Sequence, residues 1–122
     1  MAGYRVLHPG DLDFAAARDG SRGIARLSDL LEHTRANVWR LPAGTRGVRH
    51  LEKVQEELFV VLEGAPTLRL GEPPEPVSLE RGSIAIVAPG TALQVVNDGE
   101  DEAVVLIVGA PPVEGQAEYL PD

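Results

Sequence analysis

Residues 44–64, GTRGVRHLEKVQEELFVVLEG, contain the part of this sequence that decides its fold. The first half of the stretch carries His50 together with several carboxylates, and the second half contains the unbroken apolar run 58–62. An apolar run of this length that is closed by a glycine is typical of a buried β-strand. Groups that can ligate a metal therefore lie directly beside a segment that must be buried.

The composition describes one domain of 122 residues, 43% of them apolar, which is enough for a hydrophobic core. The formal net charge of −8 argues against nucleic acid or an anionic membrane as the main partner, because both are polyanions. There is no cysteine, so a metal would be held by histidine, carboxylate or water. No signal-peptide pattern and no apolar run of roughly 18 residues is present, and we therefore expect a cytoplasmic protein.

Short apolar strands alternate with glycine and proline turns along most of the chain. The expected strands cover residues 36–41, 58–63, 67–70, 77–79, 84–87, 93–96 and 103–108. Strands of this length at this spacing predict an antiparallel sandwich or barrel. The last strand is apolar on both faces, so it needs a second sheet on one side and a further sheet or subunit on the other. With few aromatic side chains in the core, this pattern predicts a homodimer.

The N-terminal segment gives weaker signals than the strands that follow it. Residues 4–7 alternate in polarity and predict a short first strand. Residues 13–20 predict one or two helical turns or an irregular arm, and residues 23–27 can form a strand. We expect a single domain over residues 1–122, with an N-terminal arm at 1–35, a core barrel at about 36–109 and a tail at 110–122.

Two groups of residues match a known family by their spacing. In the first, Gly44, His50, Glu57 and Gly64 lie where the family motif has Gly, His, Glu and Gly, and Glu52 replaces a second histidine. This pattern resembles the first motif of the cupins, which are small double-sheet jelly rolls.

The second cupin motif is only partly present. Gly82, Gly90 and Asn97 match it, whereas Ala88 replaces a proline and Leu93 replaces a histidine. The two motifs and the strands between them cover about half of the chain. The resemblance implies an all-β double-stranded β-helix, or jelly-roll barrel, with a short helical or irregular N-terminal arm.

The resemblance also implies a metal site, because the matching cupin positions usually hold a divalent ion inside the barrel. Here the candidate ligands are His50, Glu52 and Glu57, and the candidate ions are Mn, Fe, Zn and Ni. His50 and Glu52 are two residues apart and share one face of a strand, and Glu57 begins the next strand. Three protein ligands would leave open coordination positions, and Leu93 removes the fourth ligand.

Each candidate also has a purely structural interpretation. His50 can simply bond a neighbour, and Glu52 can pair with Arg49, Lys53 or Arg69 if it faces solvent. Two inward carboxylates without a cation would repel, which would raise the pKa of one of them.

Other side chains near the motifs have simpler expected roles. Trp39, Phe59 and Leu93 either line the cavity or fill it. Asn97 is expected to bond the backbone of its turn. Gln94 should point away from Leu93 in a regular strand, which makes it a poor replacement ligand.

Three functions are compatible with these observations. The first is a small-molecule-binding cupin with a partly lost metal site. The second is a metal-dependent dioxygenase, isomerase or lyase acting on a small organic acid or sugar-like substrate, with Glu52 as the candidate base. The third is a homodimeric structural or regulatory module whose cavity is filled by side chains.

Overall fold

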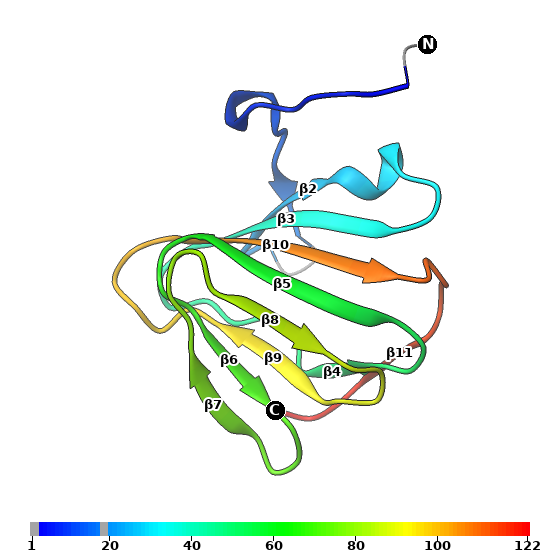
Figure 1. Cartoon of the computed structure of the whole chain (residues 1–122). Helices are drawn as coiled ribbons and strands as arrows, with labels where there is room; N and C mark the ends of the chain where they lie inside the picture. Colours follow the sequence, from blue (N-terminus) through cyan, green and yellow to red (C-terminus); the bar gives the residue numbers. More distant parts are fainter. Residues whose placement is uncertain (1–2, 18–19) are drawn as a thin grey trace.

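The computed structural model describes residues 3–17 and 20–122, which form two antiparallel sheets (Figure 1). The first sheet contains, in spatial order, β1 (Ala15–Ala16), β2 (Gly23–Arg26), β3 (Arg35–Leu41), β10 (Ala103–Ala110), β5 (Glu56–Glu63) and β8 (Ile84–Val87). The second contains β11 (Ala117–Tyr119), β4 (His50–Glu52), β9 (Leu93–Val96), β6 (Thr67–Leu70) and β7 (Glu75–Ser78). Two short 3₁₀ helices, η1 (Pro9–Asp11) and η2 (Leu27–Leu30), lie in the N-terminal segment.

The inward faces of both sheets share one hydrophobic core. Leu41 and Phe59 from the first sheet are buried in the same cluster as Leu68 and Leu93 from the second. Alternate residues of each strand face this core, as the period of a pleated strand requires. The all-β, double-sheet barrel predicted from the strand spacing is therefore confirmed.

The arm before the barrel is short and mostly irregular, as expected, but two of its details differ from the prediction. Residues 4–7 form no strand: their backbone pairs with no described strand, and Tyr4 and Val6 are exposed. An alternating pattern cannot form a strand unless another strand supplies hydrogen bonds and covers one face. Residues 13–17 contain the short strand β1 instead of a helical turn, and residues 18–19 of that prediction lie outside the described residues.

Segments from both ends of the chain complete the two sheets. β2 pairs with β3, with Ile24 opposite Trp39, and extends the first sheet. β11 pairs with β4, with Tyr119 opposite His50, and lies beside it in Figure 1. Both segments therefore border the interior of the barrel. Within residues 3–17 and 20–122, no helix is long and apolar enough to cross a membrane.

Candidate metal centre

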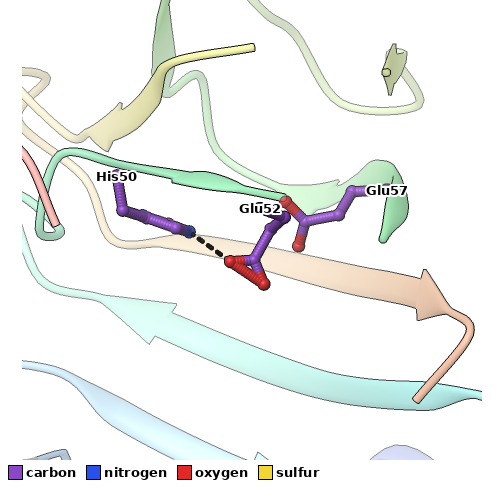
Figure 2. A group of neighbouring side chains, drawn as sticks. All are labelled: His50, Glu52 and Glu57. Carbon is purple, nitrogen blue, oxygen red and sulfur yellow. Dashed lines mark ion pairs between the residues drawn. The ribbon is translucent and has the colours of Figure 1, made fainter. Parts of the chain in front are cut away.

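His50, Glu52 and Glu57 converge inside the barrel (Figure 2). His50 and Glu52 are the first and last residues of β4, so their side chains leave the strand on the same face. Glu57 is the second residue of β5, in the other sheet. One ligand atom from each residue lies within 4.8 Å of the others. The structure thus brings together the three residues that were expected to meet, and metal binding itself stays a prediction.

The imidazole of His50 is oriented by a bond to the backbone. Its Nδ1 lies 2.9 Å from the carbonyl oxygen of Val48, which can only accept, so Nδ1 is the donor. Nε2 then carries the lone pair of the neutral ring and lies 3.6 Å from Oε2 of Glu52 (Figure 2). A proton or a metal ion between these two atoms would make the contact favourable. This ring orientation is the one seen when a histidine ligates a metal through Nε2.

Glu52 is held from the opposite side by Gln116, which the sequence analysis did not identify. Nε2 of Gln116 donates to Oε1 of Glu52 at 2.7 Å, and both side chains are buried. The Oε1 atom of Gln116 accepts from the backbone nitrogens of Val54 and Gln55 at 2.9 and 3.3 Å. Gln116 therefore ties the C-terminal segment to the loop between β4 and β5 and directs Glu52 Oε2 toward His50. No motif in the proline-containing tail signals this role.

Glu57 is the least satisfied group of the three. Its side chain is 8% exposed, and its Oε1 is buried with no hydrogen-bond partner among the described residues. The pKa of Glu57 is raised to about 7, mainly by burial and also by the charge of Glu52. The guanidinium of Arg35 acts in the opposite direction. The raised pKa belongs to Glu57 and so marks a second candidate base beside Glu52, the residue expected from the sequence.

The donor set suits a divalent ion of the kind expected. One imidazole nitrogen and two carboxylate oxygens match the preferences of Mn, Fe, Zn and Ni. Ligand atoms at about 2.0–2.2 Å from an ion lie at most about 4.4 Å apart, so only a small inward movement of these side chains is needed. The buried Oε1 of Glu57 would gain the partner that it lacks. Leu93, opposite His50 on β9, occupies the place of a fourth ligand.

A cavity of about 500 Å³ lies between the sheets next to the three residues. Trp39, Phe59 and Leu93 all line it, together with the candidate ligands. Phe59 and Leu93 also belong to the buried core, so they line the cavity and support the barrel at once. A cavity of this size is in the range of small-molecule sites. The third hypothesis, a barrel filled by its own side chains, does not agree with this space.

The structural alternatives for the neighbouring residues are also decided. Glu52 faces inward, while Arg49 pairs with Glu72 and Arg69 donates to Oε1 of Gln94 at 2.8 Å. Gln94 is thus engaged away from the candidate ligands, as expected.

Asn97 bonds the backbone, as predicted. Its Nδ2 donates to the carbonyl oxygens of Leu41 and Asp101 at 2.8 and 2.9 Å, and its Oδ1 accepts from the Gly99 nitrogen.

The double-sheet barrel with an internal cavity and an inward His/Glu/Glu group defines the general class of this protein. Residues 37–109 match the family model described as the Cupin domain, which is more than half of the chain. The protein therefore belongs to the cupin family. No curated protein matches the sequence.

Solved structures with the same fold cover nearly the whole chain. A sugar phosphate isomerase of the cupin superfamily from Silicibacter pomeroyi has a TM-score of 0.80 at 24% identity, over 97% of this chain and 83% of that one. The polyketide cyclase RemF from Streptomyces resistomycificus has a TM-score of 0.84 at 15% identity, over 98% and 87%. A predicted oxalate decarboxylase from Thermotoga maritima has a TM-score of 0.76 at 16% identity, over 86% and 97%. At these identities the similarity establishes the fold alone.

Proposed function

We propose that this protein is a small-molecule-binding cupin in which His50, Glu52 and Glu57 hold one divalent metal ion beside the cavity. The observation that carries the proposal is the convergence of three ligand atoms within 4.8 Å, one of them from a buried carboxylate whose Oε1 has no partner among the described residues. An uncompensated buried carboxylate is costly, and such groups are normally paired or bound to a metal. The site keeps three of the four family positions as ligands, so it is reduced and not abolished.

Different residues present the ligand atoms and line the cavity. His50 presents Nε2 because its Nδ1 is bonded to Val48, and Glu52 presents Oε2 because its Oε1 is bonded to Gln116. Leu93, Phe59 and Trp39 give the cavity an apolar wall that excludes water around a ligand. A bound divalent ion would supply a Lewis acid that polarises an oxygen atom of the ligand.

A second candidate function is metal-dependent catalysis on a small organic acid or sugar-like substrate. The specific observation in its favour is the pKa of Glu57 near 7, the range in which a carboxylate is an effective general base at neutral pH. In this second function Glu57 acts as the base and not as a metal ligand, because Glu52 is already bonded to Gln116 and lies beside His50. The similar structures described as a sugar phosphate isomerase, a polyketide cyclase and an oxalate decarboxylase support an enzymatic role of this general kind.

The test of the metal site uses two histidine variants. After treatment with a chelator, the protein is titrated with Mn²⁺, Zn²⁺ and Ni²⁺ by calorimetry, and its metal content is measured after dialysis. We expect about one ion per chain, and a loss of affinity of at least about 10-fold in His50→Ala. His33→Ala is the matched control, because His33 also lies near a glutamate, Glu32 at 3.7 Å, but on the exposed surface. Failure of the wild type to bind any ion, or equal affinities in the two variants, would overturn the proposal.

A further inference from the structure

The cavity has a second polar region, opposite in charge to the His/Glu/Glu group. The carboxylates of Glu52 and Glu57 lie on β4 and β5, whereas Arg26 and Arg35 line the cavity from β2 and β3. A small molecule inside the barrel therefore meets both carboxylates and guanidinium groups. Charge separation of this kind favours a ligand with one anionic end.

The strand register places Arg35 and Glu57 in one row across the first sheet. Arg35 is opposite Gly109 on β10, and Gly109 is opposite Glu57 on β5. Gly109 has no side chain, so the row contains a notch between the cation and the carboxyl. The side chain of Gln55 lies over this notch: a Cβ atom at Gly109 would be 2.7 Å from Gln55 Oε1. Any side chain at position 109 would displace the Gln55 amide.

Both polar groups beside the notch have hydrogen-bonding capacity that the described residues do not use. Gln55 is 3% exposed and lines the cavity, and its Nε2 is buried with no hydrogen-bond partner there. The guanidinium of Arg35 also forms no ion pair or side-chain hydrogen bond with a described residue, and its charge acts on Glu57. A buried amide donor without an acceptor is destabilising unless a ligand or water satisfies it.

The hydrogen-bond donors of Gln55 and Arg35 determine which chemical group of a ligand can bind there. The amide N–H of Gln55 and the planar guanidinium of Arg35 both line the cavity and require an acceptor, and a carboxylate supplies two coplanar oxygens with one negative charge. With a divalent ion bound, the two glutamates and the ion cancel, and the arginines that line the cavity leave a positive charge that favours an anionic ligand.

We propose that Arg35 and Gln55 form a carboxylate-binding subsite over Gly109, which orients a small carboxylic acid with its other end toward the His/Glu/Glu group. The orientation toward the metal depends on the proposed function, but the subsite itself does not. Arg35 and Gln55 would select substrates by charge and place them, and neither would take part in bond making. The substrate class is thereby narrowed to small carboxylic acids in preference to neutral sugars, and the comparison with phosphate tests the choice of anion.

Fluorescence offers a direct test, because Trp39 is the single tryptophan of the chain and lines the cavity. The full chain, metal-free and zinc-loaded, is titrated with succinate, with its neutral diamide succinamide and with inorganic phosphate. We expect a saturable change with succinate that is at least about 10-fold tighter than with either other probe. Arg35→Gln and Gln55→Leu should each weaken succinate binding by about 10-fold or more. Arg81→Gln, an exposed arginine after β7, should leave it unchanged.

The other outcomes separate the two proposals. Zinc affinity should be the same in Arg35→Gln and in the wild type, so a failed metal site is detected independently of the subsite. If the wild type binds no metal, Arg35-dependent succinate binding by the metal-free protein still decides the subsite. The subsite is refuted if succinate gives no saturable change, if succinamide binds equally well, or if phosphate binds more tightly in an Arg35-dependent way. It is also refuted if Arg35→Gln and Arg81→Gln, both with unchanged thermal midpoints, bind succinate alike.

Discussion

Gln116 donates a hydrogen bond to Glu52 across 64 residues of sequence, at 2.7 Å and fully inside the protein. A candidate metal ligand on β4 is therefore positioned by the residue that immediately precedes β11. Such supporting bonds fix the direction of ligand side chains, and their loss typically lowers metal affinity by about 10–100-fold.

The first prediction follows from this bond. Gln116→Leu should weaken Zn²⁺ or Mn²⁺ binding by about 10–100-fold in calorimetric titration. It should also lower the free energy of unfolding by about 2 kcal/mol, because the Val54 and Gln55 nitrogens lose their acceptor. Glu118→Gln on the exposed side of β11 is the control and should change neither quantity. Wild-type metal affinity in Gln116→Leu would show that Gln116 only supports the fold.

Glu57 should make the stability of the metal-free protein depend on pH. Its pKa is raised from 4.5 to about 7, so the folded state binds more protons than the unfolded state between these values. The free energy of unfolding should therefore fall as pH rises from about 4.5 to 7, by up to about 3 kcal/mol, and level off above pH 7. Denaturant titrations at pH 5, 6, 7 and 8 measure this slope.

The same titrations on two variants identify the group. Glu57→Gln should remove this part of the slope and raise stability at pH 8, whereas Glu56→Gln, its exposed neighbour, should keep the slope. Added metal should also reduce the slope in the wild type, because the ion compensates the buried charge. A slope that survives in Glu57→Gln would assign the titration to another residue.

Leu93 offers a gain-of-function test of the metal site. It is opposite His50 on β9 and lines the cavity, so a histidine there would face the candidate ligands. Leu93→His should tighten Zn²⁺ and Ni²⁺ binding by about 10-fold or more, because a fourth ligand completes a tetrahedral set. Val95→His, on the same face of β9 but two residues away, should give a smaller gain. Equal or weaker binding in Leu93→His would place the ion elsewhere.

Gly64 should be the least replaceable of the turn glycines. Its φ is +82°, and a Cβ there would lie 2.7 Å from the carbonyl oxygen of Glu102 and 2.8 Å from Cα of Ala103. Gly64→Ala should cost about 3 kcal/mol or more, because the backbone of residues 102–103 or of the turn itself would have to move. Gly82→Ala has φ +87° but open space around it, and should cost about 1–2 kcal/mol. Similar thermal midpoints in the two variants would contradict this.

We expect a homodimer, because the outer face of the first sheet exposes apolar side chains. An apolar outer patch runs across β8, β5 and β10, and consists of Ile84, Val60 and Leu106 in one row and Ile86, Leu58 and Val108 in the next. Ile84 and Ile86 are 62% and 75% exposed, and β8 is an edge strand. A second copy would cover this patch, and an uncovered apolar sheet face is an aggregation hazard.

Light scattering on the wild type and on two variants tests the dimer. The wild type should have the mass of two chains, and Ile84→Lys/Ile86→Lys should give a monomer that keeps its β-sheet circular dichroism. Val113→Lys, an exposed apolar residue outside the patch, should remain dimeric. A monomeric wild type would refute the prediction.

Local sequence patterns were sufficient for most of the barrel strands, the turns and the inward direction of the candidate ligands, but they did not predict β1 or β11. Alternate residues of a strand point to opposite faces, and a glycine with positive φ ends the strand. The strand and the turns within residues 44–64 therefore depend mostly on residues that are close in sequence. The same local rule failed at residues 4–7, because alternation says nothing about whether a partner strand is present.

Only the tertiary structure shows that Gln116 bonds Glu52 and that Arg35 and Gln55 line the cavity. It also shows that the pKa of Glu57 is raised. Each of these roles depends on the register of strands that are far apart in sequence, such as Arg35 opposite Gly109 and Gly109 opposite Glu57. A pKa likewise depends on the water excluded and the charges approached by a side chain in three dimensions. The spacing of residues along the chain therefore determines the strands, the turns and the faces of the strands. The closed barrel determines which distant side chains meet and which of them lose contact with water.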